Sequence, residues 1–374
     1  MALAPINTPD SLDWAEPGRG RKADAPWRIP LLGWKDILWR AYRKLSHDSL
    51  PSVAGGVTFY VLLATFPAIT AFISVYGLFL DPSTVEHILY RLSAILPNAA
   101  LELIGGQMVY LAAQRHEVLS AAVALSTLFS VWSANAGMKA LLVGLNVAYG
   151  EREKRRYFER TVFTYAITLS LVTVLSGILV LMAGAPLLLD AIGLRGVTLG
   201  WAPLNWLTVY LIAAAGFILI YRYGPSRRRA LWRWVSFGGA GAALLWMVGS
   251  LAFTAYLDNF THLGVTYGSL GAVVGFMLWL WFSVMVLLIG AELNAEIEHQ
   301  TAVDSTIGPP VPFGERGAVV ADTVGKALMV SPQEARDLAG SYVRRQMAKL
   351  ARLRGLFPFG SGARIRRRGP LDAP

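Results

Sequence analysis

The stretch GSLGAVVGFMLWLWFSVMVLLIGAELNAE, residues 268–296, decides the fold class of this chain. It holds no charged residue before Glu292. The apolar run is longer than the roughly 20 residues that a helix needs to cross the hydrocarbon core of a bilayer. The stretch therefore predicts a membrane-spanning helix over 268–291, which continues into a polar helix end.

Five further apolar stretches have the same character. They fall at about 53–80, 119–147, 161–189, 201–221 and 234–257. Of the 374 residues 55% are apolar and only 16% are charged, whereas soluble domains carry about 25% charged residues. We therefore expect an all-α polytopic membrane protein, with six transmembrane helices in a membrane domain at 51–299.

The basic residues predict the orientation of these helices. The formal net charge is +10, with 34 Lys and Arg against 24 acidic residues. When the connections are assigned alternately to two sides of the membrane, 30 basic residues fall on one side and 3 on the other. Lys and Arg are retained on the cytoplasmic side of membrane proteins. Both termini are therefore predicted to be cytoplasmic.

The N-terminal segment at 1–50 is polar, but residues 31–45 within it are amphipathic. Apolar residues recur there at helical spacing, interrupted by the basic residues Lys35, Arg40, Arg43 and Lys44. This pattern favours a short helix on the membrane surface. A helix that packs on the protein itself is an equally good interpretation.

Two further regions lie outside the six spans. Residues 83–113 form two apolar stripes too short to span, which indicates amphipathic or re-entrant helices between the first two spans; a seventh span is the weaker alternative. The tail at 300–374 begins with a Pro- and Gly-rich linker at 305–317. It is basic and predicted to be cytoplasmic and partly disordered. The basic run at its end is expected to contact anionic lipid head groups through Arg364, Arg366, Arg367 and Arg368.

Four stretches of the chain resemble the bacterial YihY/BrkB family of inner-membrane proteins, once labelled ribonuclease BN. They are DSLPSVAGGVTFYVLLATFP at 48–67, WSANAGMKALLVGLNVAYGEREKRRYFERT at 132–161, YRYGPSRRRALWRW at 221–234 and YGSLGAVVGFMLWLWFSVMVLLIGAELNAE at 267–296. The resemblance covers about 40–300. It implies a six-span protein of the inner membrane, with links to serum resistance and, for some members, to transport of lipids or other envelope components.

Polar residues at membrane depth are the candidates for function, because a charge there is costly. Asn135, Lys139 and Asn146 share one face of the second predicted span. Glu292, Glu296 and His299 share one face at the end of the last span. Lys139 and Glu292 lie at a similar depth, so that an ion pair between the two helices is one interpretation.

Each of these residues also has a simpler interpretation. Lys139 can extend its ammonium group to the inner head groups, or it can line a cavity that receives an anionic head group. Glu292 can serve structural pairing, or it can bind a proton or cation. Glu296 and His299 are predicted to be a solvated helix end.

Other candidates concern entry and packing. Asp258 and Asn259 are predicted in a far-side connection, where loop polarity is the more common role and substrate entry the rarer one. Small residues allow close helix packing in membranes, and a proline inside a span favours a kink. The residues that we assign to these roles are Gly55, Gly56, Gly271, Gly275 and Pro67.

The sequence excludes several kinds of chemistry. It has no cysteine, no metal-binding histidine motif, no nucleotide-binding P-loop and no nucleophile elbow, so that we expect no cofactor, no metal and no enzymatic activity. Nucleic acid is not an expected partner, whereas a homo-oligomer is compatible with the sequence.

Three functions remain. The first is a transporter of lipid or another amphiphilic or anionic envelope component, without an ATPase of its own. The second is a non-transporting scaffold that supports envelope integrity, and the third is an ion-coupled exporter of small solutes. A scaffold tolerates replacement of Lys139 and Glu292 but depends on its basic tails, whereas a transporter shows the opposite.

Overall fold

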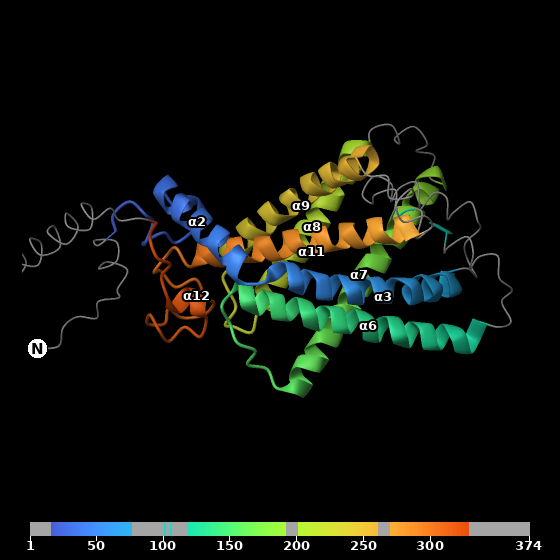
Figure 1. The fold of residues 1–374 in the computed structure, drawn as a ribbon, viewed down its shortest axis with the longest axis horizontal. Helices are drawn as coiled ribbons and strands as arrows, with labels where there is room; N and C mark the ends of the chain where they lie inside the picture. Colours follow the sequence, from blue (N-terminus) through green and yellow to red (C-terminus); the bar gives the residue numbers. More distant parts are fainter. Residues whose placement is uncertain are drawn as a thin grey trace, which may run out of the picture.

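The chain folds into a bundle of long helices (Figure 1). The computed structural model describes residues 16–76, 119–191, 201–260 and 270–328, together with residues 101, 105 and 106. Within these residues the helices are η1 (Pro26–Arg28), α2 (Leu31–His47), α3 (Leu50–Tyr76), α6 (Leu119–Ala148), α7 (Tyr157–Ala191), α8 (Trp201–Tyr223), α9 (Trp232–Phe260), α11 (Gly271–Glu298) and α12 (Val319–Asp322). The prediction of an all-α fold is confirmed.

Five helical segments in the described part are long and apolar enough to cross a membrane. They are Leu50–Ala68, Ala124–Ala148, Trp206–Tyr223, Trp232–Tyr256 and Gly271–Glu298. They contain much of five of the six predicted spans. The remaining predicted span, 161–189, lies within α7, a helix of 35 residues whose side chains are described as far as Val174.

Helix α11 has the central place in the bundle (Figure 1). It packs against α2, α3, α6 and α9, while α3 pairs with α6 and α8 pairs with α9. The core between these helices is built from buried aliphatic and aromatic residues such as Leu142, Leu145, Tyr221 and Leu288. Apolar side chains that face outward, such as Leu128 and Leu251, are exposed on the same helices. This arrangement suits a bundle that is surrounded by lipid.

Close contacts between helices occur at Gly144 and Gly290, and not at Gly55 and Gly56, for which they were predicted. A Cβ atom at Gly290 would collide with Ala242 and the hydroxyl of Tyr221, and one at Gly144 would lie 2.8 Å from Leu288. At Gly55 and Gly56 a Cβ atom would meet nothing within 4 Å. The packing role predicted for Gly55 and Gly56 is therefore wrong, because neither Cβ position faces another helix within contact distance.

The packing roles of Gly271 and Gly275 and the kink at Pro67 remain predictions. Gly271 and Gly275 are buried in the first turns of α11. Pro67 lies inside α3, which continues beyond it to Tyr76.

Several predictions concern residues at the ends of the described segments or outside them. Asp258 and Asn259 belong to the last turn of α9 rather than to a connection, which corrects their predicted place. Except for residues 101, 105 and 106, which are helical, the predicted re-entrant segment at 83–113 lies outside the described residues. The same holds for the tail after 328, with the predicted lipid-contact residues Arg364, Arg366, Arg367 and Arg368.

The contact at Gly290 predicts the effect of a single added methyl group. We expect Gly290→Ala to cost about 1–3 kcal/mol of folding free energy, because Ala242 and Tyr221 would have to move. Thermal unfolding of the purified protein in one detergent, followed by tryptophan fluorescence, measures this loss. Gly55→Ala is the matched control and should unfold at or above the native temperature, because alanine favours the helix and meets no neighbour. Equal stability of the two variants would contradict the packing that we describe.

Candidate functional site

At one end of the bundle, α2 lies beside the last turns of α11 (Figure 1). Asp36, Arg40 and Lys44 are four residues apart on α2, so that they occupy one helix face. Residues 292, 296 and 300 follow the same spacing at the end of α11. We call these six residues, which are Asp36, Arg40, Lys44, Glu292, Glu296 and Gln300, the charge ladder.

The inner part of the charge ladder is a set of ion pairs. The ammonium nitrogen of Lys44 lies 3.1 Å from Oε1 of Glu292 and 2.9 Å from Oε1 of Glu296. The guanidinium of Arg40 pairs with Oε2 of Glu296 and also donates to Oε1 of Gln300 at 2.8 Å. Lys44 thus pairs with both Glu292 and Glu296, whereas Glu296 also pairs with Arg40.

The outer part of the charge ladder binds the N-terminal segment. Asp36 accepts two hydrogen bonds from Nη1 of Arg19, at 2.6 and 2.8 Å, and a longer one of 3.5 Å from Nε2 of Gln300. The backbone N–H of Leu328 also donates to Asp36 at 2.8 Å. Because the order of contacts reverses between the two helices, α2 and α11 run in opposite directions along the ladder.

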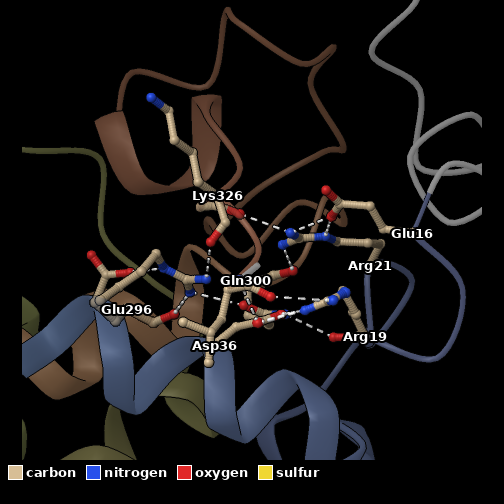
Figure 2. A network of polar contacts seen from close by, with 10 residues as sticks. Glu16, Arg19, Arg21, Asp36, Glu296, Gln300 and Lys326 are labelled. Atoms are coloured by element: carbon tan, nitrogen blue, oxygen red, sulfur yellow. Dashed lines mark hydrogen bonds and ion pairs between the residues drawn. The ribbon is translucent and has the colours of Figure 1, made fainter. Parts of the chain in front are cut away.

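Figure 2 shows how the segment before α2 and the segment after α11 close over these residues. The buried Arg21 donates to the carbonyl oxygens of Gln300 at 3.0 Å and Gly325 at 2.7 Å, and it pairs with Glu16 at 2.5 Å. Burial lowers the pKa of Arg21, and the nearby Glu16 offsets part of this effect. Residues after 300 therefore pack on the bundle as far as 328, and this packed part includes the Pro- and Gly-rich segment at 305–317.

The carboxylates of the ladder are deeply buried. Glu292 is 1% exposed and Glu296 is 0% exposed, although the sequence predicted that Glu296 lies in a solvated helix end. That prediction is wrong, because α2 covers this end of α11. Burial by itself would lower the pKa of Lys44, but attraction by Glu296 and Glu292 raises it above the ordinary value of a lysine. Lys44 therefore stays charged between the two carboxylates.

A second buried group lies on another face of α11. Arg227, from the connection between α8 and α9, makes two hydrogen bonds of 2.8 Å to Glu298 and lies over the ring of Tyr149, 4.3 Å from its centroid. Asn294 donates to the hydroxyl of Tyr149 at 2.9 Å. Burial lowers the pKa of Arg227, but the charge of Glu298 outweighs this and raises it. The group joins the end of α6 and the connection between α8 and α9 to α11, with each formal charge paired.

Asn146 has a structural place that its sequence pattern did not indicate. Its Oδ1 accepts a hydrogen bond of 2.8 Å from the backbone N–H of Ser226, and its Nδ2 donates to Glu153 at 3.1 Å. These contacts hold the connection after α6 against the connection after α8. Both polar atoms of Asn146 are thus occupied by the protein.

Lys139 and Glu292 do not pair. The ammonium of Lys139 lies over the ring of Tyr157, 5.6 Å from the centroid, at the place where α7 packs on α6. Among the described residues no carboxylate lies within 4 Å of this ammonium. The cation of Glu292 is Lys44 instead, so that the interpretation of a Lys139–Glu292 ion pair is wrong.

The surroundings of Lys139 are basic and aromatic. Arg160 donates to its carbonyl oxygen at 3.1 Å, while Tyr157 and Phe158 are 83% and 76% exposed. One helical turn away, Asn135 is buried, and its Oδ1 has no hydrogen-bond partner among the described residues. The candidate residues thus divide into two places, Asn135 and Lys139 on the α6–α7 side and Glu292 on the α2–α11 side.

The partners of Glu292 and Glu296 were not predicted from the sequence. The signal was the spacing of Asp36, Arg40 and Lys44, which places two cations and one carboxylate on a single face of α2. On a membrane-surface helix these cations would face the head groups; here they face α11.

Long apolar helices joined by charged segments at one end define a multi-pass α-helical membrane protein. The chain belongs to the family described as Virulence factor BrkB, which matches residues 41–312.

Relatives within bacteria are distant. The UPF0761 membrane protein of Tolumonas auensis is 25% identical over 285 residues, which cover 68% of this chain and 83% of the relative. The corresponding protein of Ralstonia nicotianae is 24% identical over 273 residues, with 72% of this chain and 60% of the relative covered. A Bacillus subtilis relative whose name describes it as ribonuclease-like, YfkH, is 25% identical over 249 residues, with 65% and 88% covered. No solved structure matches the chain.

The charge ladder predicts a strong dependence of stability on Arg40. Arg40→Met should cost about 3–5 kcal/mol, because it leaves the buried Glu296 with only a share of Lys44. Adding Glu296→Gln should recover much of the loss, since Lys44 and Glu292 then form a simple pair. Thermal unfolding in detergent checks both variants. Lys35→Met, an exposed change on the same helix, is the control, and a loss as large in Lys35→Met as in Arg40→Met would refute the assignment.

Proposed function

We propose that the chain is a six-span protein of the bacterial inner membrane with both termini on the cytoplasmic side. The segments 16–48 and 299–328 pack on each other and therefore lie on the same side of the membrane. A chain that leaves and returns to one side crosses the membrane an even number of times. The basic connections at 149–156 and 224–231 lie at the same end. Helix α7 starts from this end and supplies a sixth passage beside the five candidate spans. The excess of Lys and Arg in these segments favours the cytoplasmic side.

Within this arrangement the chain acts as a transporter of an anionic amphiphile, such as a lipid. The observation that carries this proposal is Lys139, a cation inside the span Ala124–Ala148 that has no carboxylate partner among the described residues. A cation at such a depth calls for a counterion. Arg160 adds a second positive charge nearby, and its own carboxylate contact, to Glu153, is long at 3.9 Å. A phosphate or carboxylate head group would supply the missing charge.

The position of Lys139 suits the head group of an amphiphile. It lies nine residues before the end of α6, or about 13 Å along the helix axis, which is near the boundary of head groups and hydrocarbon. Tyr157 is an aromatic residue of the kind that favours this boundary. Beyond it, α7 exposes the apolar residues Val162, Leu169 and Val172, along which acyl chains can lie.

Helix α2 offers a second contact with the membrane. Its ladder face packs on α11, whereas the opposite side exposes Leu31, Leu38 and Tyr42 next to the basic Lys35 and Arg43. Apolar residues flanked by cations bind anionic bilayer surfaces. One face of α2 thus packs on the protein, and the opposite face is proposed to contact the membrane, so that both interpretations of residues 31–45 enter the proposal.

The alternatives make different demands on the same residues. A scaffold needs the basic tails but not Lys139, and an exporter of small solutes needs no apolar surface beside its binding site. The ribonuclease-like name belongs to the Bacillus subtilis relative. The proposal for this chain does not include that activity.

Lys139 should be required for movement of anionic lipid. In proteoliposomes, the native chain should accelerate the transfer of fluorescent phosphatidylglycerol between leaflets more than that of phosphatidylcholine, as measured by dithionite quenching. Lys139→Gln should lower the rate about tenfold or more, because a hydrogen bond to a charged group contributes about 1.5–3 kcal/mol. Lys139→Arg should retain activity, and Arg152→Gln, an exposed change in the next connection, is the control. Native rates in Lys139→Gln would refute the role of Lys139, and a native chain that does not accelerate transfer would favour the scaffold.

The membrane contact of α2 can be measured separately. Because the chain has no cysteine, Leu38→Cys provides a single site for a spin label. In anionic vesicles this label should be accessible to oxygen and protected from a water-soluble nickel reagent. A label at Glu315→Cys, on an exposed part of the segment after α11, should behave in the opposite way. Equal exposure of both labels to the water-soluble reagent would refute the contact.

A further inference from the structure

Glu292 is the residue of the charge ladder that is least satisfied by its neighbours. Glu296 receives the guanidinium of Arg40 and a share of Lys44, and Nδ1 of His299 lies 3.5 Å from it. Glu292 has only its share of Lys44, through Oε1. Its Oε2 has no hydrogen-bond partner among the described residues, although the side chain is buried. The free carboxylate oxygen is thus a vacant acceptor inside the protein.

The charges around Glu292 do not balance. The cations Arg40 and Lys44 come from α2, while Glu296 and Asp48 add two negative charges beside that of Glu292. The titratable groups that complete the surroundings are His47, His299 and Tyr149, and burial raises the pKa of Tyr149, which keeps its phenol neutral. Two cations therefore face two buried carboxylates and the partly exposed Asp48. An unbalanced buried charge is costly, and uptake of one proton removes it.

A proton fits this place better than a metal ion does. Lys44 already lies within 3.1 Å of both Glu292 and Glu296, so that a metal ion would have to compete with its ammonium group. The described residues also provide no third carboxylate or histidine ligand in a suitable cluster. A proton needs a single oxygen, and Oε2 of Glu292 is available.

From this geometry we propose that Glu292 is a proton-binding site and that the proton is the coupling ion of the transport proposed above. The coupling, though not the binding of the proton, rests on that proposed function. When Glu292 takes up a proton at Oε2, it loses its negative charge and its attraction to Lys44. Lys44 then pairs with Glu296 alone, so that one of the contacts that hold α2 on α11 is lost. Release of the proton restores it.

The site is placed where such a change reaches the bundle. Glu292 follows Gly290 by two residues, and at Gly290 the helix α11 touches Ala242 of α9 and Tyr221 of α8. The hydroxyl of Tyr221 donates to the carbonyl oxygen of Leu287 at 2.8 Å. A shift of the end of α11 relative to α2 therefore acts on its contacts with both α8 and α9.

Infrared difference spectroscopy of the full chain in vesicles of phosphatidylcholine and phosphatidylglycerol tests the proton site directly. Exchange from alkaline to acidic buffer should produce the carbonyl band of a buried protonated carboxyl group. Glu292→Gln should remove this band, whereas Glu315→Gln, a change of an exposed carboxylate, should leave it in place. Persistence of the band in Glu292→Gln would overturn the proposal.

A second variant keeps the test valid if Glu292→Gln does not fold. Lys44→Met leaves Glu292 in place but removes its cation, so that the carboxyl group should remain protonated in both buffers. The pH-dependent difference should then disappear although Glu292 is present. A native difference spectrum in Lys44→Met would show that the band does not come from Glu292.

Coupling is tested by the rate of phosphatidylglycerol transfer with and without an imposed pH gradient. The gradient should accelerate transfer several-fold by the native chain and have no effect on Glu292→Gln. If the native chain moves lipid at the same rate with and without the gradient, the coupling is refuted and the transport function stands. If it moves no lipid but shows the Glu292 band, the transport function is refuted and the proton site stands.

Discussion

Two carboxylates, Glu292 and Glu296, are buried at the end of the central helix α11, and an ionised carboxylate is costly to bury unless cations lie beside it. Within the described part of the chain, Arg40 and Lys44 of α2 provide these cations. Helix α2 must therefore lie on α11. Its position in turn brings Arg19 to Asp36 and allows the segments before α2 and after α11 to close over the ladder. A buried apolar cluster that includes Ile37, Trp234 and Ile297 packs beside the ladder and holds the same end of the bundle.

The sequence predicted the helices well and their contacts poorly. Membrane spans are visible as long apolar runs, because a helix needs about 20 apolar residues to cross the hydrocarbon core of the bilayer. The close contacts depend on which helices become neighbours, and a single sequence does not contain that information. Gly55 and Gly144 look alike as small residues in apolar helices, yet only Gly144 faces a neighbouring side chain, that of Leu288.

The positions of the site residues along their helices were predicted, but their partners were not. Depth along a span follows from counting residues, so that Lys139 and Glu292 were correctly recognised as charges near one end of their helices. Depth does not determine the direction in which a side chain points around the bundle. Lys139 points to Tyr157 on α7, whereas Glu292 faces Lys44 on α2. The spacing of Arg40 and Lys44 contained the missing partner, but an amphipathic surface helix has the same spacing.

The two incompletely balanced charges, Lys139 and Glu292, lie on different sides of the bundle but act on helices that touch. Leu288 of α11, one turn before Glu292, packs where Gly144 of α6 leaves room for it, and Gly144 lies little more than one turn from Lys139. A movement of α11 on protonation of Glu292 would press directly on α6, since no side chain at Gly144 separates the two helices. Head-group binding at Lys139 and proton binding at Glu292 can therefore influence each other through packing alone, without a direct contact between the two residues.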